Sequence, residues 1–217
     1  PYSLLDNYGD LFAYQTANNN SESLFQLQWL TGSTDAIGWG CNNAMQAFFA
    51  WSTMVGETNW GNATYASYDL VREYDPQDRI RRHNTICTVG EYYSELNSKN
   101  GGYTYNVTES GYDNKCNIKK HVIGKIDDNG QSYQQSSGVN TYMMRLAEVY
   151  LNLAEAILGN NASTTDETAL DYFNKVRIRA GMPELKSITY ENLRYERRIE
   201  FALEGLYWYD LLRRSYY

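Results

Sequence analysis

Apolar residues recur at intervals of three and four between residues 142 and 158, with polar residues between them. The apolar positions are Tyr142, Leu146, Val149, Tyr150, Leu153 and Ile157. Side chains at this spacing lie on one face of an α-helix. We therefore predict a helix over residues 142–158, with this stripe packed against a second helix.

The second helix is predicted over residues 167–180. Thr164-Thr165-Asp166-Glu167 is typical of a capping box, in which a threonine oxygen accepts a hydrogen bond from the third amide. Gly181 followed by Pro183 is a stop signal. The apolar stripe is then Ala169, Leu170, Phe173, Val176 and Ala180. Alanine and phenylalanine four residues apart on the second helix are typical of a tetratricopeptide repeat. The linker of residues 159–166 is longer than that repeat allows, so we expect a helical hairpin that forms one degenerate repeat.

A third helix is predicted to begin near Thr189. Its apolar residues are Leu193, Ile199, Phe201, Leu203, Leu211 and Leu212. The chain before residue 140 differs from this helical part, since it is rich in Tyr, Trp, Asn, Gly and Ser and has short alternating runs typical of strands. Those runs are residues 25–29, 84–89 and 116–123.

The 217 residues are expected to form a single, mainly α domain, because no Pro-rich or Gly/Ser-rich linker divides them. Residues 141–217 would be a tetratricopeptide-like helical frame. Residues 1–140 would be a loop-rich excursion with short β-strands, and long loops on a rigid frame often carry the binding residues. We therefore expect the ligand to bind in the excursion.

Charge and composition exclude several classes of protein. The net charge of −7 lacks the dense basic surface that a nucleic-acid partner requires. No apolar run reaches the ~20 residues that span a bilayer. Cys41, Cys87 and Cys116 are too widely spaced for a disulfide framework or a tetrahedral metal site. Free thiols are the favoured interpretation, and one disulfide is the alternative.

Three segments together resemble the C-terminal part of the SusD/RagB family. They are Arg145-x-Ala147-Glu148-x-x-Leu151-x-x-Ala154-Glu155-Ala156, Val176-Arg177-x-Arg179-Ala180-Gly181, and Glu196-Arg197-Arg198-x-Glu200 through Glu204-Gly205 to Asp210-Leu211. Residues 4–12, 22–29 and 74–79 are also similar to that family, so the resemblance covers nearly the whole chain. One departure is Tyr207, which stands where the family usually has an arginine.

The resemblance implies a surface lipoprotein that captures nutrients for a SusC-like TonB-dependent transporter in the outer membrane. It also implies that a signal peptide, a lipidated cysteine and further helical repeats precede Pro1, so that the chain is a fragment anchored to the membrane by lipid. The implied ligand is an oligosaccharide. Its identity stays open.

Aromatic and amide side chains alternate in the first half of the excursion, a combination that suits sugars. A sugar ring packs its C–H face on an aromatic plane, and its hydroxyls pair with amides or carboxylates. We expect ligand binding to depend on these loop residues and not on the C-terminal helices, and we interpret Trp51 as a core residue. The candidate ligand-binding residues are Asp35, Trp39, Asn42, Asn43, Asn59, Trp60, Tyr65 and Tyr68.

An enzyme is the less favoured interpretation. Glu148 and Glu155 lie seven residues apart on one helix, about 10.5 Å by helical rise. A paired arginine should lower the pKa of each, the wrong direction for a general acid. The arginines available as partners are Arg145, Arg177, Arg179, Arg197 and Arg198. His83 and His121 stand in no catalytic motif. We expect no catalytic residue, metal or cofactor. The alternatives that remain open are a helical-repeat scaffold that binds peptides and a glycoside hydrolase.

Overall fold

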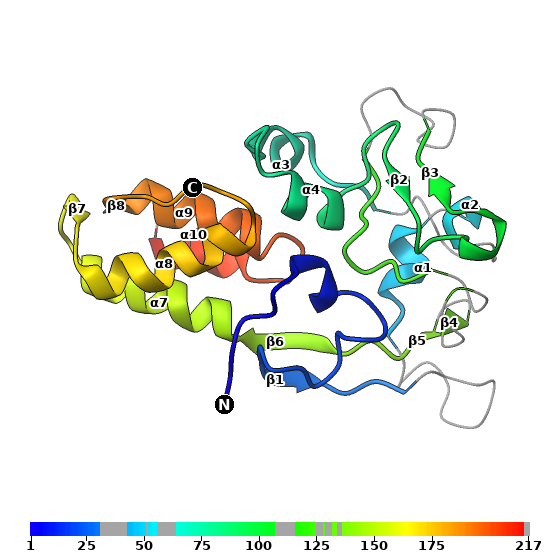
Figure 1. Ribbon diagram of the computed structural model, residues 1–217, viewed down its shortest axis with the longest axis horizontal. Coiled ribbons are helices and arrows are strands. Elements are labelled where there is room, and N and C mark those ends of the chain that lie inside the picture. Colours follow the sequence, from blue (N-terminus) through cyan, green and yellow to red (C-terminus); the bar gives the residue numbers. More distant parts are fainter. Residues whose placement is uncertain are drawn as a thin grey trace.

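The computed structural model describes residues 1–30, 43–50, 52–55, 64–106, 116–124, 128, 132–133 and 136–214. It is mainly helical (Figure 1). The four longest helices gather at one end of the molecule, and the short helices and hairpins of the first half of the chain gather at the other. This division confirms the prediction of a helical frame that carries a loop-rich excursion.

The centre of the frame is the pair of helices α7 (Leu146–Leu158) and α8 (Glu167–Arg179), which pack against each other as the predicted hairpin. Their contact is apolar and excludes water completely. The buried residues are Ala147, Leu151, Ala154 and Leu158 of α7 and Ala169, Phe173 and Val176 of α8.

The predicted stripe of the first helix is wrong in its details. Residues 141–145 form a strand, β6 (Thr141–Arg145), so Tyr142 is not helical, and the helix begins only at Leu146. Val149 and Leu153 are 39% and 36% exposed, because α7 turns its Ala147–Leu151–Ala154–Leu158 face to α8 instead. Small alanines let the two helices approach closely, and Val149 and Leu153, two positions after Ala147 and Leu151, face outward.

The ends of α8 follow the sequence signals more closely. Asp166 is the N-cap, and its carboxylate accepts a hydrogen bond from the Ala169 amide at 3.0 Å, so the residue predicted to cap the helix is wrong by one or two positions. Gly181 ends the helix with a φ of +72°, as the predicted left-handed stop requires.

The predicted third helix is two helices. Thr189 caps α9 (Tyr190–Glu200) through a capping box with Asn192, close to the predicted start. The chain then leaves the helix, with Leu203 and Gly205 at φ values of +66° and +87°, and a separate helix, α10 (Tyr207–Arg214), follows. Positive φ values interrupt a right-handed helix, so Leu211 and Leu212 belong to α10.

Two antiparallel ribbons belong to the frame, and one of them joins it to the N-terminal part of the chain. β1 (Ser23–Leu27) pairs with β6, and β7 (Ser163–Thr164) pairs with β8 (Ile188–Thr189). The predicted strand of residues 25–29 is thus partly confirmed. Because β1 and β6 are neighbours, the excursion between them leaves the frame and returns to it at the same place (Figure 1).

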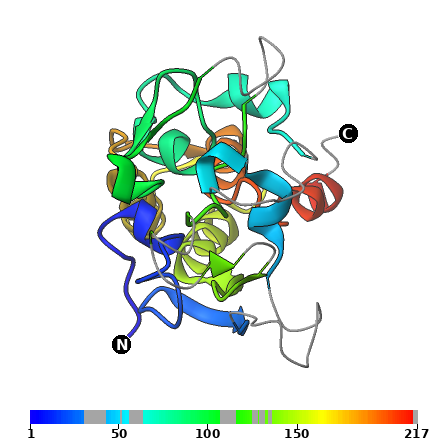
Figure 2. The same ribbon diagram turned by 90° about the vertical axis from the view of Figure 1, so that its right-hand side faces the viewer.

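The excursion has a core of its own, built from buried aromatic and aliphatic side chains such as Met54, Tyr93 and Tyr105. Figure 2 turns this end of the molecule towards the viewer and shows its short helices and strands. Its described elements are short: α1 (Met45–Phe49), α2 (Ser52–Val55), α3 (Tyr68–Glu73), α4 (Arg79–Thr85), η3 (Ser98–Asn100), and the paired strands β2 (Tyr92–Tyr93) with β3 (Tyr103–Thr104) and β4 (Ser132–Tyr133) with β5 (Ser136–Ser137). A further short helix, η1 (Tyr8–Leu11), precedes β1.

Two predicted strands of the excursion are wrong. Residues 84–89 begin at the end of helix α4, and Ile86 forms only an isolated bridge with Ile118. Cys116 forms an isolated bridge with Ala66. Cys87 is buried and Cys116 half-buried, both as free thiols, which confirms the favoured interpretation for these two. Cys41 lies outside the described residues.

A cluster of buried charged side chains lies where the frame meets the excursion. We call it the buried charge cluster; among the described residues its acids are Glu22, Asp78, Glu196, Glu200 and Glu204, and its bases are Arg81, Lys120, Arg145, Arg177 and Arg179. These residues come from the N-terminal segment, α4, residues 116–124, β6, α8, α9 and the turn after α9. The two signs are balanced, so the cluster adds no net charge to the interior.

Arg145 and Glu200 are the centre of the cluster. The guanidinium of Arg145 donates to Glu22 at 2.8 Å, to Glu200 at 2.6 Å and to Glu204 at 2.8 Å. Glu200 also pairs with Arg179 and with Arg81. Arg145 thus pairs with both Glu200 and Glu204. Burial alone would raise the pKa of Glu200, but the positive charges of its three arginine partners outweigh burial and lower this pKa to about 2.

Replacing Leu151 with alanine should destabilise the frame, because Leu151 is fully buried between α7 and α8. The expected loss is roughly 2–5 kcal/mol in the free energy of unfolding. Leu153→Ala on the exposed face of α7 is the matched control and should cost well under half as much. Urea denaturation of both variants measures the difference, and equal losses would contradict the observed orientation of α7.

Replacing Glu200 with glutamine should cost roughly 3–5 kcal/mol at neutral pH, because it leaves buried arginines without a compensating charge. Glu184→Gln, at an exposed glutamate with no described ion pair, is the control. Because the folded-state pKa of Glu200 is about 2, below its ordinary value of 4.5, the stability it contributes is present above pH 4.5 and is lost as the pH falls towards 2. The gap between wild type and Glu200→Gln in urea titrations should therefore narrow over that range; a constant gap would rule out this coupling.

Candidate functional site

Most of the predicted ligand-binding residues fall where the structure gives no description. Asp35, Trp39, Asn42, Asn59 and Trp60 lie outside the described residues, as does Trp51. Their role in binding stays a prediction. Asn43, Tyr65 and Tyr68 are described.

Asn43 is buried and holds two parts of the excursion together. Its backbone forms a bridge with Ser137, and its side-chain amide donates to the Val139 carbonyl at 3.0 Å. Its Oδ1 accepts a hydrogen bond from the Met45 amide at 2.9 Å. Both polar atoms of this side chain therefore have protein partners, which gives Asn43 a structural role beside the predicted one.

Tyr68 is the first residue of α3 and is 61% exposed, with the Arg72 guanidinium 5.3 Å from the centre of its ring. Tyr65 is half-buried just before it, next to the bridge between Ala66 and Cys116. The contacts of Asn43 are with Met45 and with residues 137–139, whereas the ring of Tyr68 contacts Arg72 of its own helix. These contacts do not bring Asn43 and Tyr68 together.

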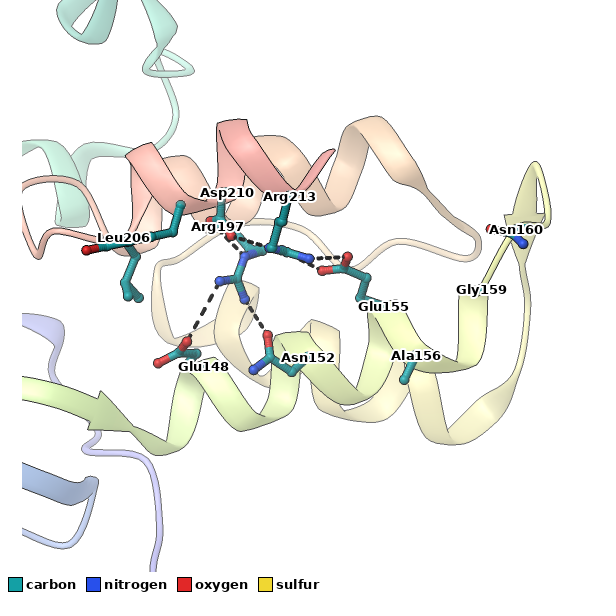
Figure 3. A pocket seen from close by; sticks show the side chains of 11 residues that line it. Glu148, Asn152, Glu155, Ala156, Gly159, Asn160, Arg197, Leu206, Asp210 and Arg213 are labelled. Atoms are coloured by element: carbon teal, nitrogen blue, oxygen red, sulfur yellow. Dashed lines mark hydrogen bonds and ion pairs between the residues drawn. The ribbon is translucent and has the colours of Figure 1, made fainter. Parts of the chain in front are cut away.

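A cleft of about 570 Å³ opens in the helical frame between α7 and α10 (Figure 3). Polar and charged side chains from both helices and from α9 point into it. Its lining consists of Glu148, Asn152, Glu155, Ala156, Gly159, Asn160, Arg197, Leu206, Tyr209, Asp210 and Arg213. We call it the α7–α10 cleft.

One end of the cleft is closed by fully formed ion pairs. Arg213 donates to the two carboxylate oxygens of Glu155 at 2.6 and 2.9 Å, and its Nε donates to Asp210 at 2.8 Å (Figure 3). A bidentate arginine–carboxylate pair is the strongest form of this interaction. Glu155 is thus held by a cation, but its partner is Arg213 and not one of the arginines expected from the sequence.

The other end is less completely paired. The Arg197 Nη1 donates to Asn152 Oδ1 at 2.6 Å and its Nε to Asp210 at 2.9 Å, but its Nη2 lies 3.9 Å from the Glu148 carboxylate. Burial raises the pKa of Glu148 above its ordinary value, and the distant Arg197 offsets this only in part. The prediction that arginine lowers the pKa of Glu148 is therefore wrong, because the ion pair is too long.

A second, smaller cleft of about 330 Å³ lies between the segment after η1 and the excursion, with Lys119, Glu95 and Asp128 among its lining residues. Its charges are occupied, since Lys119 pairs with Glu95 at 3.2 Å and Asp128 accepts hydrogen bonds from the amides of Asn97 and Ser98. Over the described part of the chain, no group of His, Cys, Asp and Glu side chains is arranged to hold a metal ion. None of the described helices has the length and apolar character needed to cross a bilayer.

The class of this protein is defined by a hairpin frame of tetratricopeptide type and by a long excursion before it, which the β1–β6 ribbon ties to the frame. The chain belongs to the SusD family, whose model matches residues 6–217. This result confirms the family resemblance seen in the sequence.

Among curated proteins, a SusD-like protein of Bacteroides ovatus is 42% identical over 213 residues, which cover 96% of this chain and 37% of that protein. SusD-like protein P2 of Formosa agariphila is 27% identical and covers 95% of this chain and 42% of the relative. The chain therefore spans about two fifths of the length of these relatives.

Among solved structures, a crystal structure with xylogluco-oligosaccharide is 40% identical, with a TM-score of 0.89 over 100% of this chain and 42% of the other. Surface glycan-binding protein A from Bacteroides thetaiotaomicron in complex with laminarihexaose is 24% identical, with a TM-score of 0.72 over 99% of this chain and 47% of the other. The second similarity concerns the fold alone.

Proposed function

We propose that this chain is part of a cell-surface glycan-binding protein that captures oligosaccharides. The observation that carries the proposal is the structure with xylogluco-oligosaccharide, which matches the whole chain at 40% identity and a TM-score of 0.89. At that level of similarity the frame, the excursion and the place where one joins the other are shared. Binding of a soluble glucan fragment by a related surface is therefore the best-supported activity.

The chemistry of the excursion is consistent with this proposal. Trp39 and Trp60 stand among glycines, which allows a ring face to be exposed, and Asn42, Asn43 and Asn59 are close in sequence to those rings. Flat aromatic faces beside amides are the combination that sugars require. The buried core of the excursion and the buried charge cluster would hold such loops in place on the frame.

We further propose that the captured glycan is passed to a SusC-like TonB-dependent transporter, and that the protein is attached by lipid to the cell-surface side of the outer membrane. Membership of the SusD family supports this step. Transfer requires that each sugar contact be weak enough to release, which suits stacking on exposed rings better than deep enclosure.

A peptide-binding scaffold is the alternative, because tetratricopeptide-like hairpins often present a groove to peptides. The two candidates differ in the ligand. A panel of oligosaccharides and unstructured peptides tested by calorimetry would separate them, and binding of peptides alone would overturn the proposal. Turnover of any glycan would instead favour a hydrolase.

Replacing Trp39 or Trp60 with alanine should weaken oligosaccharide binding without affecting folding. Loss of one stacking ring should cost about 1–3 kcal/mol of binding free energy, by analogy with stacking on a base. The matched control is Trp208→Ala, because Trp208 is an exposed tryptophan on α10, outside the excursion. Isothermal calorimetry with xylogluco-oligosaccharide and laminarihexaose measures the effect.

Two outcomes would contradict the predicted site. Wild-type affinity in both Trp39→Ala and Trp60→Ala would place the ligand elsewhere. Loss of folding in both variants, seen as a collapsed thermal transition, would make these tryptophans core residues.

Delivery to a transporter predicts a stable partnership in the outer membrane. The full-length protein should copurify with a TonB-dependent transporter after gentle detergent extraction of that membrane, and a lipid should be found on its N-terminal cysteine by mass spectrometry. Recovery of the protein alone and without lipid would count against both the partnership and the localisation, while leaving glycan binding untouched.

A further inference from the structure

The α7–α10 cleft contains polar groups without full hydrogen-bond partners beside open space. The side chain of Glu148 is only 13% exposed, yet its one described ionic contact is with Arg197 Nη2 at 3.9 Å. That distance is too long for a hydrogen bond. Among the described residues, the carboxylate therefore accepts no hydrogen bond, although burial penalises its charge.

The facing donors are incompletely used as well. Arg197 donates through Nε to Asp210 and through Nη1 to Asn152 Oδ1, whereas Nη2 has only the long contact with Glu148. Asn152 Oδ1 accepts a hydrogen bond from Arg197 Nη1, and Asn152 Nδ2 donates to no described residue. Figure 3 shows that Glu148 and Asn152 project from neighbouring turns of α7 towards Arg197.

The charges around the cleft restrict what can fill this gap. A free cation would face the guanidinium groups of Arg197 and Arg213, and a free anion would face Glu148, Glu155 and Asp210. A neutral hydroxyl group meets neither repulsion. Its hydrogen can be donated to Glu148 while its oxygen accepts from Arg197 Nη2, so a single hydroxyl satisfies both groups.

A second hydroxyl on the adjacent carbon would lie within reach of the Asn152 Nδ2 donor, and Leu206 with Tyr209 supplies apolar surface on the same cleft. The volume of about 570 Å³ is within the range of small-molecule sites. Vicinal hydroxyls on a partly apolar ring are the defining chemistry of a sugar.

We propose that the α7–α10 cleft is a second, weak sugar-binding site on the helical frame, with Glu148, Arg197 and Asn152 as its polar contacts. The ligand is a neutral sugar unit, so the inference rests on the proposed function for its ligand class. It does not rest on the loop tryptophans. It also departs from the expectation that the C-terminal helices take no part in binding.

The test is an NMR titration of the full-length protein, labelled with ¹⁵N-asparagine, using D-glucose as the probe. The side-chain amide signal of Asn152, assigned by its absence in Asn152→Asp, should move and saturate. Glu148→Ala removes the acceptor and should raise the dissociation constant roughly tenfold or more, since hydrogen bonds to charged groups contribute about 1.5–3 kcal/mol. Glu148→Gln keeps an acceptor oxygen and should weaken binding less.

Glu184→Ala, at an exposed glutamate outside the cleft, is the matched control and should bind glucose like the wild type. An Asn152 signal that does not move, or that moves equally in Glu148→Ala, overturns the inference and leaves the cleft to water. Movement with arginine amide but not with glucose would overturn it too, because it would identify a cationic ligand.

The same titration in the double variant Trp39→Ala/Trp60→Ala separates this site from the predicted loop site. An unchanged Asn152 response there supports a cleft that binds independently of the loops, whatever happens to oligosaccharide affinity. Loss of the Asn152 response in a double variant that is still folded would overturn an independent cleft site. The calorimetric affinity for oligosaccharide thus tests the predicted loop site, and the NMR signal of Asn152 tests the cleft site.

Discussion

Charges that are removed from water must be matched by opposite charges at close range, and this requirement governs how the protein is assembled. The buried charge cluster draws its members from seven separate stretches of the chain, with Arg145 and Glu200 at the centre. An unpaired buried charge costs several kcal/mol, so an arrangement that shifts α4 or the 116–124 segment against the frame leaves arginines or glutamates uncompensated. Apolar surfaces are less selective, because they can slide over one another at little cost. The cluster therefore fixes the orientation of the excursion on the frame.

The frame and the excursion on either side of that junction have different cores. The hairpin of α7 and α8 is a continuous apolar core of alanine, leucine and phenylalanine and serves as the rigid support. The excursion has a second core rich in tyrosine, which holds short elements and long connections rather than long helices. Rigid supports with variable loops allow a single fold to bind many ligands. The α7–α10 cleft is different, because its polar groups stand on helices and their geometry is set by the frame.

The sequence predicted local features well and distant ones poorly. The stripe of α8, its stop at Gly181 and the cap at Thr189 depend on neighbouring residues only, and all three were predictable. The start of α7 depends on β1, more than a hundred residues earlier in the chain, whose pairing makes residues 141–145 extended. The predicted stripe of α7 leaves out Ala147 and Ala154, which are buried against α8, and so it marks the wrong face of the helix. Glu148 and Glu155 are recognisable in the sequence as a pair on one helix. Asp210 and Arg213, which complete the cleft, lie on α10, which the sequence pattern predicts as a continuation of α9. The positions of the loop residues of the predicted site depend on long-range packing. The periodicity of apolar residues does not predict such packing.

The β1–β6 ribbon has a consequence for how such proteins diversify. Because these strands are hydrogen-bonded neighbours, the intervening segment is a closed insertion whose two ends are already held together by the frame. The entropic cost of closing a loop grows only with the logarithm of its length, by about 0.6 kcal/mol for each doubling. Evolution can therefore lengthen, shorten or exchange the stretches between the anchored elements of the excursion at small cost to folding. Under the proposed binding of glycan by the excursion, changes in these stretches alter the ligand while the packing of the α7–α8 hairpin is kept.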